Sequence, residues 1–210
     1  LRTVLSAGLR TVATESNLNN DIGVPLSLLK ITPDTQIAII EMGASHPDDI
    51  AKLVKVSEPD YGIITNVGKA HLLGFGSFEG VKKAKGRLYD YVNEFGKAVF
   101  VNEDDEVLRS MCAEREGLSI VPYGLNTDGC TILETTSESP FLRIKLSDGK
   151  VVNTSLIGNY NSANVLAALC VGKFFGISED NALAAIASYR PSNSRSQMVR
   201  TERNSLIVDA

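Results

Sequence analysis

Several features that would assign a functional class directly are missing from this sequence of 210 residues. The Gly-rich phosphate loop, GxxxxGK[ST], does not occur. Four Gly-Lys pairs are present, at positions 68, 96, 149 and 172, but each lacks the upstream glycine and the following hydroxyl residue. Scanning for motifs alone therefore does not identify a nucleotide-binding enzyme.

Cysteine is scarce, and no targeting or membrane signal is evident. The three cysteines, Cys112, Cys130 and Cys170, are odd in number, widely spaced and not arranged as CxxC or CxH. This pattern favours buried free thiols in a reducing compartment. The start of the chain has no charged-then-apolar signal pattern. Residues 151–172 carry no charge, but their apolar part, residues 165–171, is too short to span a bilayer. We therefore expect no membrane insertion.

An excess of positive charge is also missing. The formal net charge is −4, with 22% charged and 43% hydrophobic residues, as in ordinary globular proteins. No basic field would attract nucleic acid or anionic lipid. A bound nucleotide would therefore need local cationic groups or a metal ion to hold its phosphates.

The first 123 residues alternate between short apolar runs and helical stretches. This pattern predicts a mostly parallel sheet with helices on both faces, an α/β fold. The expected strands are residues 36–42, 62–66, 98–102 and 118–123. The expected helices are residues 47–56, 77–95 and 104–116.

The pattern changes after Tyr123, where a smaller antiparallel sheet is expected. Its strands are residues 131–136, 141–146 and 150–156, and Ser147-Asp148-Gly149 is a hairpin turn signal. Helices are expected at residues 162–175 and 178–188, with Ser178 as an N-cap and Gly176 as a helix stop. Residues 197–200 and 205–209 are expected to form two further strands.

Candidate polar groups lie directly after apolar strands, where ligands bind in open α/β sheets. Glu41 ends the run at residues 36–42, and a capping or solvated carboxylate is an equally good interpretation. His71 lies in a Gly-rich loop after the run at residues 62–66, where a structural hydrogen-bonding role is the common one. His46, in Ser-His-Pro, is interpreted as a turn residue.

Lys85 lies at helical spacing on the apolar stripe of the helix at residues 77–95. That stripe runs Phe78, Val81, Leu88, Val92, Phe95, and Lys85 fills its one gap of seven. A lysine in apolar surroundings has a lowered pKa and a more reactive neutral amine, which carbon dioxide can carbamylate. The alternative is a packed stem with an exposed head. Lys82 and Lys83 lie off the stripe and are expected to be solvated.

Two further polar groups lie in the second half of the chain. Asn161 and Asn164 stand where a helix begins, and a plain N-cap is the default role of Asn161. An amide can also pair with the polar edge of adenine. Arg195, in a polar loop, could clamp phosphate.

Three segments, ATESNLNNDIGVP (13–25), EMGASHP (41–47) and TNVGKAHLLGFGS (65–77), together resemble the central ATP-binding domain of the Mur ligase family. The resemblance extends from Thr11 to Ala210. It implies ligation through an acyl phosphate, with ATP and Mg²⁺. By the same resemblance Glu41 ligates a magnesium near the γ-phosphate and His71 helps to hold a second one. KKAKGRLY resembles the motif with the modified lysine, which matches Lys85 and implies a carbamate there.

The resemblance also implies a nucleotide site. GNYNSANVLAAL (158–169) resembles the helix start that contacts adenine, which assigns Asn161 and Asn164 to the base. Arg195 resembles the arginine that reaches the phosphates, and Asp209 the aspartate that holds the ribose hydroxyls. Tyr160 stands where the family often has histidine.

TESNLNNDIGVPLSLL (14–29) resembles the branch of the family that joins D-alanyl-D-alanine to UDP-N-acetylmuramoyl-tripeptide, a step of peptidoglycan precursor synthesis in the cytoplasm. This implies that Asn17, Asn19 or Asn20 contacts the muramoyl peptide. The resemblance implies a full-length protein that acts as a monomer. The family's phosphate loop, its UDP-binding domain and its C-terminal domain have no counterpart in these residues. We therefore expect the chain to be a central-domain fragment.

Two alternatives remain open. The first is another amide ligase of the same superfamily, one that adds diaminopimelate, lysine or glutamate. The second is a binding module with a nucleotide-binding fold and no catalysis.

Overall fold

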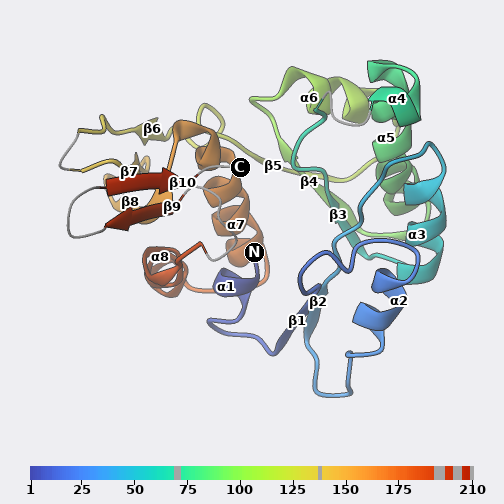
Figure 1. Cartoon of the computed structure of the whole chain (residues 1–210), viewed down its shortest axis with the longest axis horizontal. Coiled ribbons are helices and arrows are strands. Elements are labelled where there is room, and N and C mark those ends of the chain that lie inside the picture. The colour runs from blue at the N-terminus through green and yellow to red at the C-terminus, as the bar shows by residue number, and fades with distance from the viewer. Residues whose placement is uncertain (69–71, 137–138, 192–196, 201–204, 209–210) are drawn as a thin grey trace. The chain divides into compact units, whose positions relative to one another are not determined.

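The computed structural model of the protein describes residues 1–68, 72–136, 139–191, 197–200 and 205–208. The chain forms two compact units. The first, Leu9–Tyr123, is called here the parallel-sheet unit, and the second, Gly124–Ala210 together with Thr3–Gly8, the antiparallel-sheet unit. Figure 1 labels the elements of each unit.

The strands of the parallel-sheet unit pair in parallel. β1 (Thr11–Ala13) pairs with β2 (Ile37–Ile39), and a three-stranded sheet has the order β3 (Tyr61–Ile63), β4 (Ala98–Asn102), β5 (Ile120–Tyr123). The four strands expected from apolar runs are confirmed as elements. β1 was not predicted, because three residues are too few to form a recognisable pattern.

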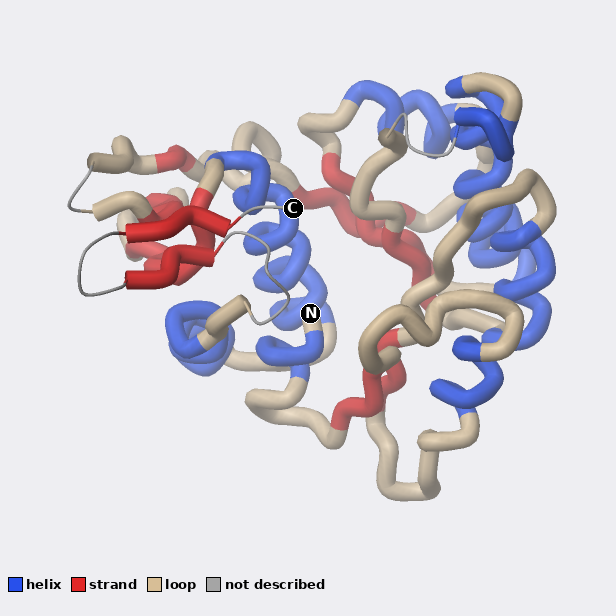
Figure 2. Tube along the Cα trace, in the orientation of Figure 1, coloured by secondary structure: helices blue, strands red, loops and turns tan. Residues whose placement is uncertain are grey.

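The described helices that connect these strands are α2 (Gly23–Leu28), α3 (Asp49–Ser57), α4 (Leu72–Phe75), α5 (Phe78–Phe95) and α6 (Glu106–Ala113). Side-chain caps fix two of the starts. Ser77 Oγ accepts a hydrogen bond from Gly80 N before α5, and Asp105 Oδ1 accepts two from the first turn of α6. Figure 2 shows α3 and α5 running along one side of the strands. The sequence predicted α3, α5 and α6 but not the short α2 and α4.

The core of this unit lies between β4 and the helices α5 and α6. Val99 and Val101 of β4 are at most 1% exposed and pack with Tyr89, Leu108 and Met111. Ala98 and Phe100 alternate with these two valines and are buried as well. β4 is therefore buried on both faces, as its continuous apolar run predicted.

The antiparallel-sheet unit contains the second sheet, in the order β6 (Thr131–Ile132), β7 (Phe141–Lys145), β8 (Val151–Ile157). The turn between β7 and β8 is the one the sequence predicted. Gly149 there has φ +89°, a conformation that glycine adopts without steric cost. β9 (Gln197–Arg200) and β10 (Ser205–Val208) form an antiparallel pair.

The helices of this unit are α1 (Arg2–Leu5), the 3₁₀ turn η1 (Asn159–Asn161), α7 (Ser162–Phe174) and α8 (Glu179–Ser188). The predicted caps are confirmed. Gly176 follows the end of α7, and Ser178 Oγ accepts from Asn181 N at 3.4 Å. α1 was not predicted, although its Val4 and Leu5 are 1% exposed.

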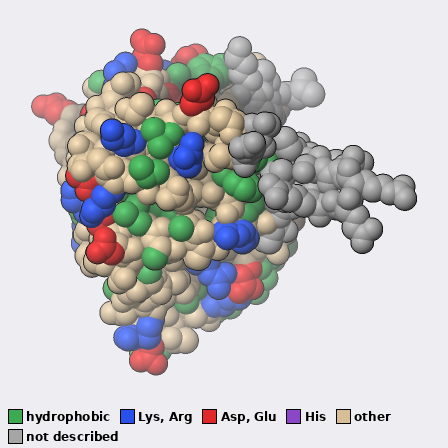
Figure 3. Space-filling view, turned by 90° about the vertical axis from the view of Figure 1, so that its left-hand side faces the viewer, with side chains coloured by type: hydrophobic (Ala, Val, Ile, Leu, Met, Phe, Trp, Pro, Cys, Tyr) green, Lys and Arg blue, Asp and Glu red, His purple; other side chains and the backbone are tan. Residues whose placement is uncertain are grey.

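Charged side chains are interspersed on the surface. Figure 3 shows one face, on which Lys and Arg lie among Asp, Glu and apolar side chains. In the described part of the chain, no helix has both the length and the apolar content needed to cross a bilayer.

Candidate functional site

The carboxyl ends of β1 and β2 lie side by side, because the two strands are parallel and in register from Thr11 and Ile37 onward. Each strand end carries a polar residue. The Thr14 amide donates to Ile39 O at 2.9 Å, and the Glu41 amide donates to Thr14 Oγ1 at 2.9 Å. Glu41 therefore leaves the sheet at its carboxyl edge, as the sequence predicted. Its side chain is exposed.

Asn19 holds the Glu41 carboxylate in place. Its Nδ2 donates to Glu41 Oε1 at 2.8 Å, and its carbonyl oxygen accepts from the Gly43 amide at 2.7 Å. A Cβ at Gly43 would lie 2.9 Å from the Asn19 side chain, so this approach requires glycine. Among the described residues, Glu41 Oε2 has no hydrogen-bond partner, which leaves it available to a ligand.

The three asparagines that the sequence left unresolved have different roles. Asn19 contacts Glu41. Asn20 uses its Oδ1 to accept from Gly23 N at 2.8 Å and from Ile22 N at 3.2 Å, which caps α2. Asn17 is exposed, and its carbonyl oxygen accepts from the Asn19 amide. Asn19 is therefore the asparagine that combines a local structural role with contact to the candidate site.

Lys85 is half-buried in the middle of α5, and its side chain reaches the carboxyl end of β3. Its Nζ donates to the carbonyl oxygen of Asn66 at 2.7 Å, and Asn66 follows β3. Burial lowers the pKa of the Lys85 amine. Both the position and the direction of the pKa shift agree with the sequence prediction.

Two details of the predicted stripe on α5 were wrong. Phe95 is 64% exposed, and the buried face includes Ala84 and Tyr89 instead. Lys82 is not simply solvated. Its side chain is 17% exposed and lies 3.6 Å from a Glu79 carboxylate oxygen and 3.5 Å from one of Glu114. Those two carboxylates draw Lys82 against the protein, whereas Lys83 is exposed as predicted.

The segments after β2 and β3 also meet. A Cβ at Gly74 of α4 would lie 2.1 Å from the Ser45 carbonyl oxygen, so the close approach of these two segments requires glycine there. His71, Arg195 and Asp209 lie outside the described residues, and the roles expected for them stay predictions.

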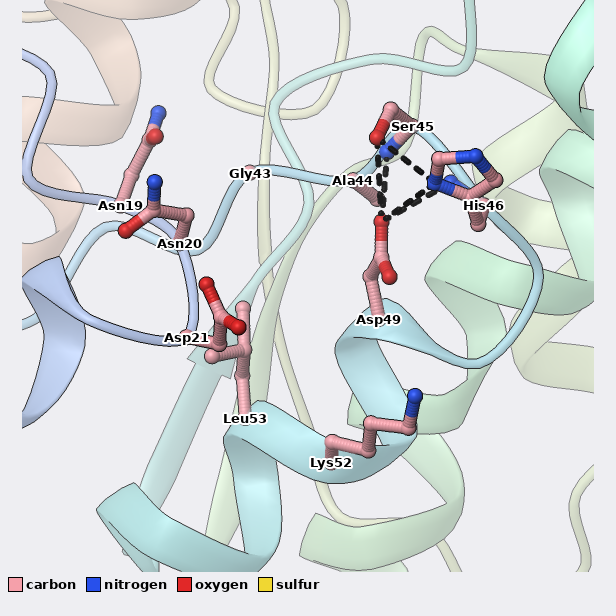
Figure 4. A pocket seen from close by; sticks show the side chains of 10 residues that line it. All are labelled: Asn19, Asn20, Asp21, Gly43, Ala44, Ser45, His46, Asp49, Lys52 and Leu53. Atoms are coloured by element: carbon pink, nitrogen blue, oxygen red, sulfur yellow. Dashed lines mark hydrogen bonds and ion pairs between the residues drawn. The ribbon is translucent and has the colours of Figure 1, made fainter.

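A pocket of about 540 Å³ opens beside Asn19 (Figure 4). One wall is the loop before α2, with Asn19, Asn20 and Asp21. The other walls are the segment after β2 and the first turns of α3, which contribute Gly43, Ala44, Ser45, His46, Asp49, Lys52 and Leu53. This pocket was not predictable from the sequence, because its walls come from two segments that are distant along the chain.

Asp49 organises the wall of this pocket near the start of α3. Its Oδ2 accepts from the amides of Ser45 and His46, both at 2.8 Å, and from Ser45 Oγ at 3.3 Å. Burial by itself raises the pKa of Asp49. The hydrogen bonds together lower the pKa by more than burial raises it, so the pKa of Asp49 lies below the ordinary carboxyl value.

His46 is a turn residue, as predicted, and it belongs to this wall. Ser45 Oγ and Asp49 Oδ2 both approach its Nδ1, at 3.0 and 3.7 Å. A catalytic triad needs the serine and the carboxylate on opposite ring nitrogens. This Ser-His-Asp group is therefore a helix-start structure and not a nucleophile.

Asn161 and Asn164 belong to the antiparallel-sheet unit. Asn161 precedes α7, but its side chain does not cap the helix, so the default N-cap interpretation was wrong. Its Nδ2 donates to the Ile157 carbonyl at 2.9 Å, and Asn164 Nδ2 lies 3.5 Å from Asn161 Oδ1. The two side chains are adjacent, and their contact with adenine stays a prediction.

The donors at the strand ends suit a hard cation. In the described part of the chain, no group of three or more His, Cys, Asp or Glu side chains could hold a metal ion. Mg²⁺ is often bound by one or two carboxylates together with substrate phosphates and water. The exposed Glu41 carboxylate, with one oxygen engaged by Asn19, fits that requirement.

Parallel strands whose carboxyl ends carry an oriented carboxylate, a half-buried lysine and a polar pocket define an α/β protein with its ligand site at the strand ends. Comparison with known families agrees with this class. Residues 1–172 match the model of the Mur ligase middle domain. The chain belongs to the Mur ligase family.

Its relatives include enzymes of one branch of that family. The UDP-N-acetylmuramoyl-tripeptide–D-alanyl-D-alanine ligase of Escherichia coli (strain K12) is 34% identical over 210 residues, which covers 98% of this chain and 46% of the relative. The ligase of the same name from Bacillus subtilis (strain 168) is 28% identical, over 100% of this chain and 46% of the relative. The chain thus spans about half the length of the curated relatives it matches.

Solved structures have the same fold. MurF from Acinetobacter baumannii superimposes with a TM-score of 0.83 at 25% identity, over 99% of this chain and 46% of that one. MurF from Thermotoga maritima, in a complex with ADP, has a TM-score of 0.83 at 24% identity, over 98% of this chain and 48% of that one. These likenesses establish the α/β architecture with its additional antiparallel sheet.

Proposed function

We propose that the full-length protein is an ATP-dependent ligase that joins D-alanyl-D-alanine to UDP-N-acetylmuramoyl-tripeptide, acting in the cytoplasm as a monomer. The observation that carries the proposal is the 34% identity to a ligase of that name over 98% of this chain. The contact between Asn19 and Glu41 adds to it. It joins the segment that resembles the D-alanyl-D-alanine-adding branch to the carboxylate expected near the γ-phosphate.

The chemistry has two steps. An oxygen of the tripeptide's terminal carboxylate attacks the γ-phosphorus of ATP, which gives an acyl phosphate and ADP. The amine of D-alanyl-D-alanine then attacks the acyl carbon, loses a proton, and expels inorganic phosphate as the amide forms. The first step brings two negatively charged groups together, and negative charge develops on the acyl oxygen and the leaving phosphate in the second, so cationic groups must neutralise this charge.

The proposal assigns roles to residues at the strand ends. Glu41 would hold Mg²⁺ through its carboxylate, with Asn19 fixing the side chain and His71 contributing to a second ion. Magnesium supplies charge neutralisation at the phosphates. Asn161 and Asn164 would contact adenine, Arg195 the phosphates and Asp209 the ribose.

Lys85 would act as a carbamate. The ammonium first loses one proton, and the neutral amine then adds to carbon dioxide with loss of a second proton, which converts a cation into an anion. The lowered pKa of Lys85 supports this role, because it increases the share of neutral amine near pH 7. The hydrogen bond from Lys85 Nζ to the Asn66 carbonyl holds the amine beyond the carboxyl end of β3.

The direct test is a product assay with the full-length protein, ATP, magnesium and UDP-N-acetylmuramoyl-tripeptide. Separate reactions receive D-alanyl-D-alanine, diaminopimelate, lysine or glutamate as the amine. We expect ADP release and a product of pentapeptide mass with D-alanyl-D-alanine alone. A product with one of the single amino acids would instead support another ligase of the superfamily. If the substrates bind but neither ADP nor a ligated product is released, a binding module would be supported instead.

A further inference from the structure

The pocket beside Asn19 contains two opposite charges that no other described residue pairs with. Asp21 stands in the loop before α2, and Lys52 on α3 lines the same pocket. Figure 4 shows them at different sides of it. Among the described residues neither side chain forms an ion pair, either with the other or with a third group. Asp49, in contrast, accepts hydrogen bonds from Ser45 and His46 through its Oδ2.

An unpaired carboxylate and an unpaired ammonium group in one pocket suit a ligand that carries both complementary charges. Charged groups without partners gain most from a ligand that pairs with them, and their separation selects its geometry. The pocket volume of about 540 Å³ lies in the range of small-molecule sites. The ligand is therefore a small zwitterion, or the zwitterionic end of a longer molecule.

The position of the pocket indicates which part of a substrate reaches it. Asn19 lines the pocket and also donates to Glu41, so the pocket begins one side chain away from that carboxylate. Under the proposed function, on which this inference rests, the carboxylate that is activated near Glu41 belongs to the last residue of the acyl donor. The side chain of that same residue is the substrate group nearest to the pocket.

We propose that this pocket binds the end of the side chain of the donor's last residue, and that it selects an end with an ammonium and a carboxylate on one carbon. Lys52 pairs with the carboxylate and Asp21 with the ammonium. Diaminopimelate has such an end. Lysine has the ammonium alone. Donors that end in diaminopimelate and in lysine are therefore a matched pair of probes that differ in a single carboxylate.

The acceptor dipeptide is also a zwitterion, but it suits the pocket less well. Its ammonium must lose a proton and attack the acyl carbon, and a carboxylate such as Asp21 would stabilise the protonated, unreactive form. The side-chain end of the donor takes no part in the reaction, so an ion pair there costs no reactivity.

The test compares two donors in the full-length protein: UDP-N-acetylmuramoyl-tripeptides that end in diaminopimelate or in lysine. We expect the wild-type protein to prefer the diaminopimelate donor by about tenfold in kcat/KM, the value of one charge-assisted contact. Lys52→Met should remove that preference by raising KM for the diaminopimelate donor. Asp21→Asn should raise KM for both donors and leave their ratio close to the wild-type value.

Lys55→Met is the matched control, because Lys55 is exposed on the same helix and does not line the pocket. It should keep the wild-type preference. Calorimetric titration of each donor without ATP gives a second readout that does not depend on turnover.

Three outcomes would overturn the inference: equal use of both donors by the wild type, an unchanged preference in Lys52→Met, or an effect of Lys52→Met on KM for the dipeptide instead. Ligation without discrimination would refute the inference and leave the proposed function standing. Absence of ligation with either donor would refute the proposed function itself.

Discussion

Glu41 and Asn19 together form the part of the candidate site in which single atoms matter most. A carboxylate on a free side chain samples several rotamers, and a ligand must pay the entropy of ordering it. Asn19 removes much of that freedom through one hydrogen bond of 2.8 Å. Gly43 permits the arrangement, since any Cβ there would collide with the Asn19 side chain. The carboxylate is thus oriented before a cation arrives.

This arrangement predicts that Glu41→Ala lowers turnover far more than it lowers stability. In the full-length protein we expect kcat to fall by about 100-fold or more, because a ligand to developing charge is lost. Glu41 is exposed, so the unfolding free energy should change by only about 0.5 kcal/mol. Asn19→Ala should raise the magnesium concentration needed for half-maximal rate. Near wild-type turnover of Glu41→Ala at limiting magnesium would exclude the metal role.

Asp49 supports a prediction about pH. Its folded-state pKa is lowered, so its contribution to stability is present above the ordinary carboxyl pKa of about 3.9 and is lost as the pH falls through the lower folded value. Asp49→Ala should cost about 1 to 2 kcal/mol at pH 7, as loss of a helix-start acceptor does. Thermal unfolding at pH 7 and pH 3 checks this. If wild type and Asp49→Ala differ in stability by the same amount at pH 7 and at pH 3, the prediction is wrong.

At the scale of elements, α5 is the helix that positions the candidate catalytic lysine. It packs on β4 through Tyr89 and Val92, and this packing carries Lys85 to the carbonyl oxygen that follows β3. Glu79 and Glu114 draw Lys82 to another side of the same helix. The three neighbouring lysines 82, 83 and 85 therefore have three different environments and should respond differently to substitution.

Lys85→Ala should abolish most activity of the full-length protein, and an added short carboxylic acid should restore part of it by replacing the lost anion. Lys83→Ala should be neutral, because Lys83 is exposed. Lys82→Ala should keep turnover but lose up to about 1 kcal/mol of stability with its ion pairs. Steady-state kinetics across a series of small acids tests this. If no acid rescues Lys85→Ala, and Lys82→Ala is equally inactive, Lys85 is a packed stem only.

Elements with strong local signals were predictable from the sequence. α5 matches the helix predicted over residues 77–95 to within one residue, and β4 has the predicted bounds, because an apolar stripe and an apolar run are properties of neighbouring residues. β1 and α1 were missed, since three or four residues leave no periodicity to detect. Phe95 was misassigned because the last turn of α5 extends past the packed face. Where the packed face of a helix ends is determined by tertiary packing, and the spacing of apolar residues does not reveal it.

The candidate site was predictable in part for the same reason. The strand-end position of Glu41 and the buried side of Lys85 follow from local pattern. The contact between Asn19 and Glu41 spans 22 positions, and the pocket joins two such distant segments. Asp21 and Lys52 look like ordinary surface charges in the sequence. Only the fold brings them to one pocket, and only the fold reveals that they lack partners among the described residues.

At the scale of the whole molecule, the account rests on one reaction: transfer of the γ-phosphoryl group to a peptide carboxylate before the amide bond forms. Membership of the Mur ligase family is established for residues 1–172, and the relatives extend well beyond this chain. The reaction is therefore a property to be measured on the full-length protein. Its signature is the fate of the carboxylate oxygens.

The decisive measurement uses UDP-N-acetylmuramoyl-tripeptide labelled with oxygen-18 in both oxygens of its terminal carboxylate. The full-length protein is supplied with this donor, D-alanyl-D-alanine, ATP and magnesium, and the released phosphate is analysed by mass spectrometry. The account predicts one labelled oxygen in each inorganic phosphate, with the other retained in the new amide. Unlabelled phosphate, or label in AMP, would contradict it, because neither outcome passes through an acyl phosphate.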